Sequence, residues 1–341
     1  MSKLWLNNSI LDRLAMLQQT EIRHSGINQI AIEKDWWVTV TLKALFQTDC
    51  SESLIFKGGT SLSKGFNIIE RFSEDIDLAI SHSFFGIEKT SKNQREKLRK
   101  TARAYIHEVL SMQLDAKLKA MGVSGYSIEN VTQVQDKNGE WRPIDSDKDP
   151  TVILLHYPSI VEDAISYIPS RVKIEISALS MDEPSEQRKI HSLIEECFEG
   201  EDAGANSKVR TVLPTRTFLE KIFLIAEEFQ KDKPRHLRMS RHLYDLEKLM
   251  DTQYGRDALS DGSLYNEIVE HRRTYYALKY INYDLHTPST INFMIPEKEL
   301  ELWKTDYAAM KQFFIYGQSL EFNELTQRIE ELNKRIKKIV F

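Results

Sequence analysis

The pattern of hydrophobic and polar positions predicts two helices within residues 10–47. Apolar residues recur every three to four positions in two runs, at Leu11, Leu14 and Leu17 and then at Val38, Leu42 and Leu45. This spacing is typical of a helix with one buried face. The sequence EKDWW, residues 33–37, leads into the second run as a dense cluster of charged and aromatic side chains.

The next segment changes from helical spacing to short apolar runs separated by turn residues. The predicted order is a short strand, a glycine turn, a helix entered through Thr60 and a second strand, at residues 54–56, 58–59, 61–71 and 76–80. The segment therefore predicts a strand–turn–helix–strand unit.

The remaining pattern predicts more strands and then a long helical region. A helix over 92–122 precedes three β-like runs, at 126–134, 151–157 and 170–177, and the polar stretch 141–150 is expected to be a loop. From about residue 186 the pattern is mostly helical, with helices expected at 215–231, 239–250, 264–278, 297–314 and 321–340. The fold class is therefore α+β: a small mixed sheet framed by helices, followed by a mostly helical C-terminal half. We place the division between two domains at residues 1–205 and 206–341.

Composition adds limits to this picture. The 341 residues are 41% hydrophobic and 28% charged, as in ordinary globular proteins, and the net charge is −5. No apolar run approaches the length of a membrane span, and the N-terminus shows no signal-peptide core, so we expect a cytoplasmic protein without a membrane. Cys50 and Cys197 are far apart, which favours free thiols over a disulfide framework.

Two carboxylates lie at the start of the predicted strand 76–80. Asp75 and Asp77 are one residue apart, so on a strand both point to the same face, while Ile76 and Leu78 point to the other. Like charges side by side repel unless a cation neutralises them, and hard oxygen ligands suit Mg²⁺. The alternative is that the two aspartates merely end a strand.

The glycine turn before them has a second chemical meaning. Gly58 and Gly59 would let the backbone approach a phosphate closely, and Thr60 adds a hydroxyl at the start of a predicted helix. A glycine turn alone is weak evidence of function. A glycine turn, a helix and an Asp-x-Asp strand in this order indicate a nucleotide-handling layout.

The stretch FKGGTSLSKGFNIIERFSEDIDL, residues 56–78, resembles the signature of the AbiEii-type nucleotidyltransferases, toxin-like enzymes of abortive-infection and type IV toxin–antitoxin systems within the DNA polymerase beta superfamily. Looser similarity recurs at EKDWW, VKIEIS, TFLEKI and SRHLYDL, so the resemblance spans residues 33 to about 250. It implies a sheet-based nucleotidyltransferase core within residues 1–205, and a helical domain, 206–341, that contributes to the active-site cleft.

The resemblance assigns roles to the first motif. Gly59 and Thr60 would hold the triphosphate of an NTP, with Gly58 and Ser61 in the same turn. Asp75 and Asp77 would hold Mg²⁺, in a two-metal arrangement.

The resemblance also implies a third carboxylate on a neighbouring strand. Glu175 lies between Ile174 and Ile176, where an unpaired carboxylate would be costly, and it is the candidate to assist the attacking hydroxyl. The alternative is a glutamate on an edge strand, paired with Lys173 or Arg171.

Two further candidates lie on predicted helices of the second half. Lys221 shares a face with Phe218 and Leu224, so it either extends to solvent or meets a buried anion, which the resemblance supplies as nucleotide phosphates. Asp245 follows Arg241 by one turn and could simply pair with it, whereas the resemblance places this acidic residue in the active site.

Residues around the two motifs are secondary candidates for nucleotide binding. Arg71 and Ser73 match the family wording R-x-S-x-D-x-D, and Arg71 could fix a carboxylate or a phosphate with two hydrogen bonds. Lys57 and Lys64 flank the glycine turn and could reach a phosphate, although solvated lysines are equally compatible with the sequence.

Two basic segments could contact RNA. The stretch KDKPRHLRMSRH, residues 231–242, is the segment with the highest density of basic residues. It lacks a set of metal ligands at zinc spacing. Arg272 and Arg273, next to Tyr275 and Tyr276, form a possible base-stacking surface, with a solvated helix face as the alternative.

Together these observations predict a Mg²⁺-dependent nucleotidyltransferase that uses an NTP, with RNA, a tRNA 3′ end in particular, as the acceptor implied by the resemblance. Such a toxin would be restrained by a cognate antitoxin, which need not form a stable complex. The alternatives are nucleotidylation of a protein or small molecule, and a nucleotide-binding module without turnover.

Overall fold

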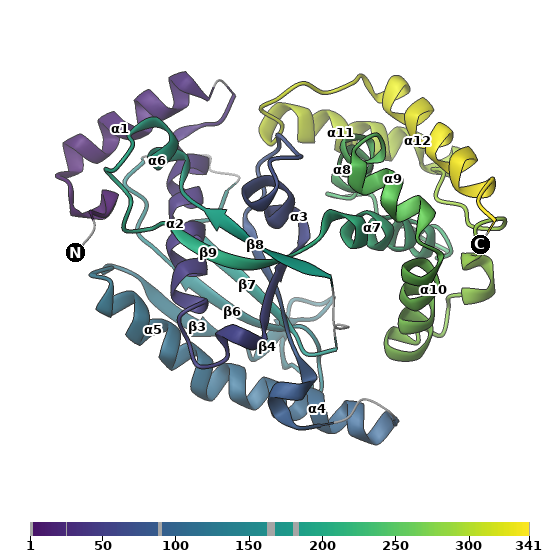
Figure 1. The fold of residues 1–341 in the computed structure, drawn as a ribbon, viewed down its shortest axis with the longest axis horizontal. Coiled ribbons are helices and arrows are strands. Elements are labelled where there is room, and N and C mark those ends of the chain that lie inside the picture. The colour runs from purple at the N-terminus through teal and green to yellow at the C-terminus, as the bar shows by residue number, and fades with distance from the viewer. Residues whose placement is uncertain (1–2, 25, 88–90, 162–167, 180–183, 341) are drawn as a thin grey trace. The chain divides into compact units, whose positions relative to one another are not determined.

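The computed structural model describes residues 3–24, 26–87, 91–161, 168–179 and 184–340. The chain forms two compact units, and each is described by itself. The first comprises Met1–Gly65 and Phe72–Thr211, and the second comprises Phe66–Arg71 and Val212–Phe341. Figure 1 shows the sheet with the helices of the first unit, and the helices of the second.

The first unit is built on a seven-stranded mixed sheet in the order β3-β6-β7-β2-β1-β9-β8. The strands are β1 (Leu54–Lys57), β2 (Asp75–Ile80), β3 (Ser127–Asn130), β6 (Thr151–His156), β7 (Arg171–Ser177), β8 (Ser185–Ile190) and β9 (Ser207–Val212). Two short strands, β4 (Gln133–Gln135) and β5 (Trp141–Pro143), form a separate hairpin. The predicted α+β architecture with a mixed sheet is confirmed.

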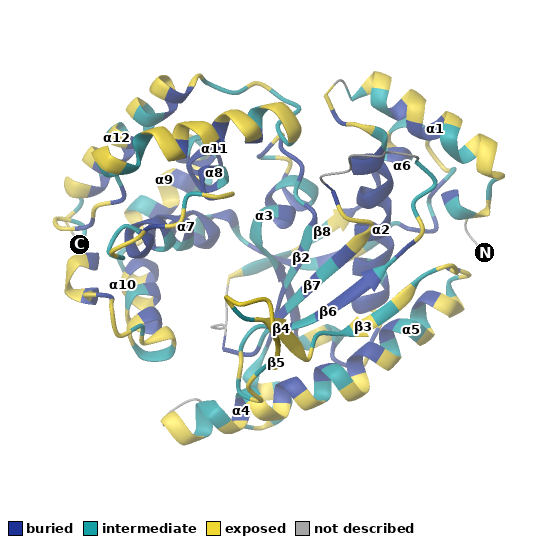
Figure 2. Ribbon diagram, turned by 180° about the vertical axis from the view of Figure 1, so that it is seen from behind, coloured by how far each residue is buried: buried dark blue, intermediate teal, exposed yellow. Residues whose placement is uncertain are grey.

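The helices of this unit are α1 (Ile10–Arg23), α2 (Gln29–Leu45), α3 (Gly58–Thr60), α4 (Lys92–Tyr105), α5 (Ser111–Ala120) and α6 (Leu193–Cys197). One π-helical turn, Ile106–Leu110, joins α4 to α5. The predicted helix 92–122 is thus confirmed in outline, with a π-helical segment in its middle. Figure 2 shows α2 almost entirely in the colour of buried residues.

One face of the sheet carries the core. Ile76, Leu78 and Ile80 of β2 and Ile174 and Ile176 of β7 are all fully buried. Alternation along each strand places the polar residues between them on the opposite face. The hydrophobic pattern therefore fixes which face of β2 and β7 is available for chemistry.

Three expectations about the first unit were wrong in part. The predicted helix 61–71 ends after one π-helical turn, Ser61–Gly65, because Asn67 adopts a left-handed conformation, φ +53°, that helices do not continue through. Strands β8 and β9 lie in the region from residue 186 that was expected to be mostly helical. The expected loop 141–150 begins with the strand β5.

The second unit is helical. Its helices are α7 (Pro214–Glu228), α8 (Ser240–Met250), α9 (Gln253–Ser260), α10 (Gly262–His271), α11 (Leu300–Phe313) and α12 (Phe322–Lys337). The pattern predicted five of them and missed α9, and the predicted helix 264–278 continues past α10 only as a π-helical turn, Arg272–Tyr276. The short segment Phe66–Arg71 joins this unit through a β-bridge between Arg71 and Ile315 and through backbone hydrogen bonds to Glu70.

Candidate active site

Asp75 and Asp77 lie on the polar face of β2, beside polar residues of both neighbouring strands. In the parallel β2–β7 pairing Asp75 is opposite Lys173 and Asp77 is opposite Glu175, and in the antiparallel β1–β2 pairing Lys57 is opposite Asp77. Three carboxylates and two ammonium groups thus meet on one face of three adjacent central strands. The two strands that carry the carboxylates, β2 and β7, are parallel.

The electrostatics of this face disfavour ionised carboxylates. Burial raises the pKa of Asp77 to about 7, and repulsion from Glu175 and Asp75 adds to the effect. Burial also raises the pKa of Asp75, with Glu74 as the next cause. A cation that bound here would relieve both the burial of charge and the repulsion.

Glu175 has two neighbours that matter for its role. The strand register places Glu175 directly opposite Asp77, and its Oε1 lies 2.6 Å from Lys173 Nζ. The alternative considered above, a pair with Lys173, is therefore present, but β7 lies between β6 and β2 and is not an edge strand. Glu175 is thus held at Asp77 by the register of the sheet and by Lys173.

Gly58 allows the Asp77 carboxylate to approach the glycine turn. Gly58 has φ +82°, and a Cβ atom at this position would lie 2.8 Å from Cγ of Asp77 and 3.0 Å from its Cβ. No side chain fits between them, so the turn needs glycine for space as well as for its backbone conformation. The backbone of the turn and the Asp-x-Asp strand are therefore one structural unit.

The hydroxyl residues of the motif brace this turn. Thr60, which is fully buried, places Oγ1 2.9 Å from Ser73 Oγ and 2.5 Å from the carbonyl oxygen of Asp75. Ser61 Oγ donates to the carbonyl oxygen of Gly58 at 2.8 Å. These hydrogen bonds tie the turn to the start of β2, and direct contact of Thr60, Ser61 or Ser73 with a nucleotide stays a prediction.

The two aspartates suit a metal ion that brings other ligands with it. Among the described residues, no group of three or more His, Cys, Asp or Glu side chains is arranged to hold a metal ion. Mg²⁺ commonly binds through one or two carboxylates and completes its shell with water and substrate phosphates. The pair Asp75 and Asp77, held rigidly on one strand, fits that mode.

Lys34 of α2 is also part of this site. The sequence drew attention to the motif EKDWW that contains it, but did not predict its role. Its Nζ lies 2.7 Å from Glu74 Oε2 and 3.0 Å from the carbonyl oxygen of Pro169, and both charged side chains are buried. Glu74 directly precedes Asp75, so this ion pair fixes the start of β2 against α2. The signal in the sequence was a charged triplet inside an otherwise apolar helix.

The two residues beside Lys34 anchor further segments to α2. Asp35 accepts a hydrogen bond from Lys64 Nζ at 2.5 Å and another from the backbone of Leu193 at 2.9 Å. Lys64, expected either to reach a phosphate or to be solvated, is thus engaged with Asp35. Glu33 accepts hydrogen bonds from Ser159 Oγ and from the backbone of Ile160.

Asp149 was missed because it lies in the stretch expected to be a simple loop. Its carboxylate accepts hydrogen bonds from Ser177 Oγ at 2.5 Å and from the backbone of Ala178 at 3.0 Å. It therefore fastens the segment after β5 to the end of β7. Burial raises the pKa of Asp149.

A second charged cluster lies within the helical unit. Arg71 Nε and Nη2 donate to the two carboxylate oxygens of Asp245 at 2.7 and 2.8 Å, and Lys221 Nζ lies 2.7 Å from Asp245 Oδ2. Burial alone would raise the pKa of Asp245, but Arg71 and Lys221 hold it well below its ordinary range. His242 Nδ1 lies 3.4 Å from Lys221 Nζ.

These contacts decide between the alternatives left open by the sequence. Lys221 is 6% exposed, so it does not extend to solvent, and the buried anion beside it is Asp245. A simple pair with Arg241 does not account for Asp245, which binds Arg71 and Lys221. Arg71 fixes a carboxylate, one of the two partners expected for it. Binding of a nucleotide by Arg71, Lys221 or Asp245 stays a prediction.

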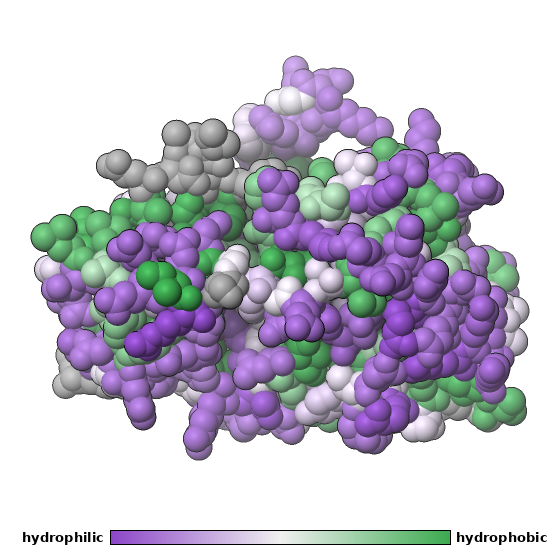
Figure 3. All heavy atoms as spheres, turned by 90° about the horizontal axis from the view of Figure 1, so that it is seen from above, coloured by the Kyte–Doolittle hydropathy of each residue, from purple (hydrophilic) through white to green (hydrophobic). Residues whose placement is uncertain are grey.

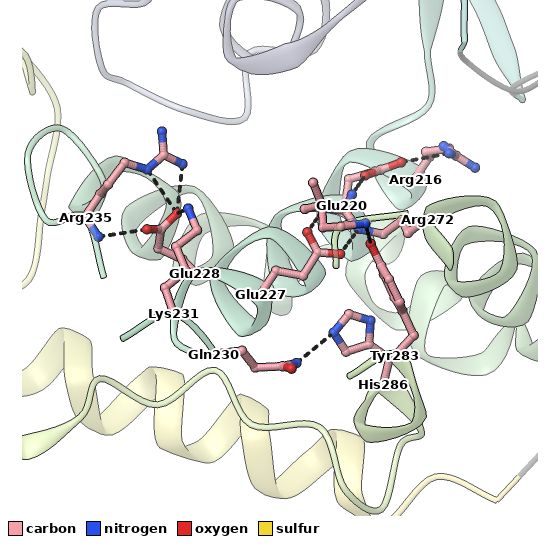
Figure 4. Close-up of polar contacts among 11 residues, drawn as sticks. Arg216, Glu220, Glu227, Glu228, Gln230, Lys231, Arg235, Arg272, Tyr283 and His286 are labelled. Carbon is pink, nitrogen blue, oxygen red and sulfur yellow. Dashed lines mark hydrogen bonds and ion pairs between the residues drawn. The ribbon is translucent and has the colours of Figure 1, made fainter. Parts of the chain in front are cut away.

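Three cations of the basic segments expected to contact RNA, Lys231, Arg235 and Arg272, are bound by carboxylates (Figure 4). Glu228 binds both Lys231, at 2.7 Å, and Arg235, at 2.8 Å. Arg272 is buried, and its guanidinium lies between Glu220 and Glu227 (Figure 4).

The prediction that Arg272 belongs to a base-stacking surface is therefore wrong. The alternative, a solvated helix face, is also wrong for Arg272, because its side chain is buried. Arg273 is exposed and binds Asp284.

The described helices include none that is long and apolar enough to cross a membrane. Hydrophilic side chains cover much of the face drawn in Figure 3, and apolar atoms form smaller areas between them.

Comparison with known families identifies the family to which the chain belongs. The model of the family described as "Nucleotidyl transferase AbiEii toxin, Type IV TA system" matches residues 41–331 of the chain. A search of curated proteins finds no matching relative. The matched region includes the glycine turn, the Asp-x-Asp strand, Glu175 and the Lys221–Asp245 cluster.

Proposed function

The chain belongs to the AbiEii nucleotidyltransferase toxin family of type IV toxin–antitoxin systems, and we propose that it transfers a nucleotidyl group from an NTP to a hydroxyl of RNA. The observation that carries this proposal is the juxtaposition of Asp75, Asp77 and Glu175 on one sheet face beside the Gly58 turn. By the sequence resemblance, the acceptor is a tRNA 3′ end, and an RNA acceptor sets the reaction in the cytoplasm.

The reaction is an in-line substitution at the α-phosphorus of the NTP. The acceptor oxygen forms a new bond to phosphorus, the bond between that phosphorus and the β-phosphate bridging oxygen breaks, and pyrophosphate leaves with the electron pair. The acceptor hydroxyl loses its proton in the process. Because the transition state gathers negative charge on phosphate oxygens, catalysis depends on positioning and on charge stabilisation.

The carboxylates of β2 and β7 would have different roles in the reaction. Asp75 and Asp77 would hold Mg²⁺, which as a bound ion draws charge from the phosphate oxygens and lowers the barrier to attack. Glu175 is paired with Asp77 in the strand register, so an acceptor hydroxyl directed to this face would meet a carboxylate able to take its proton. Lys173 holds Glu175 in place.

The turn before the carboxylates would hold the phosphates of the NTP. Gly58 and Gly59 expose backbone there, and Lys57, opposite Asp77, adds a positive charge on the same face. The hydroxyls of Thr60, Ser61 and Ser73 keep the turn in place and complete the candidate set for the triphosphate.

The Arg71–Asp245–Lys221 cluster is assigned to the same reaction by the sequence resemblance. We propose that Lys221 neutralises charge on the triphosphate and that Asp245 and Arg71 orient it. The antitoxin expected of such a system could act without a stable complex with this chain.

The test is a transfer assay. Purified protein is incubated with Mg²⁺, each α-labelled NTP in turn and total bacterial RNA, beside the variants Asp75→Ala and Asp77→Ala. Label in RNA that requires both aspartates is the expected result and also identifies the nucleotide. Label in protein instead would replace RNA as the acceptor, and a chain that binds NTP but transfers no label would overturn the proposal.

A further inference from the structure

Helix α4 carries an excess of positive charge in a chain that is otherwise acidic. Residues 92–103 contain six basic side chains and one acidic one, a net charge of +5, so the rest of the chain carries −10. Such segregation of positive charge on one element is the electrostatic signature of a nucleic-acid contact.

The charge on α4 is presented to solvent. Lys92, Lys97 and Lys100 are exposed, and the only acidic partner within the helix is Glu96, paired with Lys100 in a salt-screened surface contact. The opposite face of the helix buries Leu98 and Ala102. Lys231, Arg235 and Arg272 of the second unit differ in this respect, because buried or half-buried glutamates bind them.

The hairpin β4–β5 is attached beside α4 and adds an aromatic surface. Arg99 lies 3.3 Å from Asp147, and Arg103 donates to the carbonyl oxygen of Val131, so α4 contacts the chain on both sides of the hairpin. All six residues of the two strands are exposed, and the side chain of Trp141 is 65% exposed. Figure 2 shows β4 and β5 in the colour of exposed residues.

An exposed two-stranded ribbon is marginal by itself in water, and an exposed indole at its end gains from a flat partner. The hairpin segment 133–148 has four acidic and three basic residues, so it brings no positive charge of its own. Its contribution to binding would be stacking, whereas that of α4 would be attraction to phosphates. Lysines that follow a phosphate backbone beside a stacking aromatic are the usual design of a site for unpaired nucleic acid.

We propose that the exposed face of α4, with Lys92, Lys97 and Lys100, together with Trp141 of the hairpin, binds single-stranded RNA: the lysines contact phosphates and the indole stacks on a base. This surface rests on the proposed function in that it binds the acceptor RNA of the transfer reaction. It is a binding surface, separate from the carboxylates of β2 and β7 that carry the chemistry.

The test uses a fluorescein-labelled single-stranded oligoribonucleotide and three variants of the full chain. The variant Lys92→Gln/Lys97→Gln/Lys100→Gln should bind at least tenfold more weakly. The slope of log Kd against log salt concentration should fall by about 2, at about 0.7 per lost phosphate contact. Trp141→Ala should bind about tenfold more weakly with an unchanged salt slope, and Trp141→Phe should restore most of the affinity.

The matched control removes the same charge from the other unit. Lys334, Lys337 and Lys338 at the end of α12 are exposed, and Lys334 pairs with Glu330 as Lys100 does with Glu96. The variant Lys334→Gln/Lys337→Gln/Lys338→Gln should bind RNA as the wild type does. Equal losses in the two triple variants, or full affinity in the α4 variant, would overturn the proposal.

Two further readouts separate this proposal from the proposed function. Asp77→Ala should bind the oligoribonucleotide normally while transferring no label. The α4 triple variant should bind NTP as tightly as the wild type and show a raised KM for RNA with little change in kcat. If the wild type transfers label only to protein, RNA as the acceptor fails, and the surface then stands or falls on the binding measurements alone.

Discussion

Gly58 and Asp77 are in van der Waals contact, with no room between them for even a methyl group. A Cβ atom at position 58 would lie 2.8 Å from Cγ of Asp77, and the backbone there has φ +82°. Gly58→Ala should therefore push the carboxylate away from the turn. A misplacement of about 1 Å in a catalytic constellation can cost about 100-fold in rate, and we expect a loss of that order in nucleotidyl transfer.

A matched glycine separates this collision from backbone strain. Gly122 has φ +83°, and nothing lies within 4 Å of a Cβ atom placed there. Gly122→Ala should lose roughly 1–2 kcal/mol of stability from the left-handed conformation alone and keep its activity. The interpretation fails if the two variants, compared at equal folded fraction, lose activity to the same extent.

Asp77→Asn should make the protein inactive and more stable. Asp77 is buried and lies beside Asp75 and Glu175, so removing its charge removes repulsion that folding must overcome. In EDTA we expect the variant to gain on the order of 1 kcal/mol in urea unfolding. Added Mg²⁺ should stabilise the wild type and not the variant, because only the wild type retains both metal-binding aspartates. A variant less stable than the wild type in EDTA would contradict this picture of the site.

The positions of Asp75 and Asp77 could be predicted from the sequence because two local rules agree there. Alternation in DIDLAI sets both carboxylates on one strand face, and the glycines before it require a turn. The contact between Asp77 and Glu175 depends on strand register across nearly 100 residues, which no local rule supplies. The resemblance suggested Glu175, and the sheet shows why it is there.

The elements that the sequence missed are those whose local pattern is polar. Strands β8, SEQRKI, and β9, SKVRTV, alternate charged and apolar residues weakly, and only their pairing at one end of the sheet makes them strands. The role of Lys34 could not be predicted for a different reason: its partner Glu74 lies 40 residues away in the sequence. Such ion pairs depend on the tertiary structure. A buried charge in an apolar helix indicates only that a partner exists, and the sequence does not say which residue it is.

The Arg71–Asp245–Lys221 cluster can be tested for a role beyond structure. Asp245→Asn leaves two buried cations without their counter-charge, and we expect a loss of about 3–5 kcal/mol in chemical unfolding. Replacing all three residues, as Arg71→Met/Lys221→Met/Asp245→Leu, should recover most of that loss, because well-packed apolar side chains often replace buried ion pairs without cost.

The activity of this triple variant then decides the question. If Lys221 and Asp245 act on the nucleotide, the refolded and stable triple variant should transfer no label. A stable triple variant with wild-type transfer would restrict the cluster to holding Phe66–Arg71 in the helical unit.

His286 should make the protein less stable as the pH falls below neutral. The side chain is 1% exposed, packs against Phe223 and Tyr283, and faces the cations Arg272 and Arg273. Burial, with Arg272 and Arg273 adding to it, lowers the pKa of His286 from 6.5 to about 4. The unfolded chain therefore takes up a proton below about pH 6.5 that the folded chain does not accept until about pH 4.

Because the unfolded state binds more protons in that window, the contribution of His286 is fully present above pH 6.5 and is lost as the pH falls towards 4. The shift of about 2.5 pH units corresponds to at most about 3 kcal/mol. Urea unfolding from pH 7.5 to 4 should show a stability difference between wild type and His286→Gln that shrinks or reverses as the pH falls. Parallel curves for wild type and His286→Gln would exclude this role of His286.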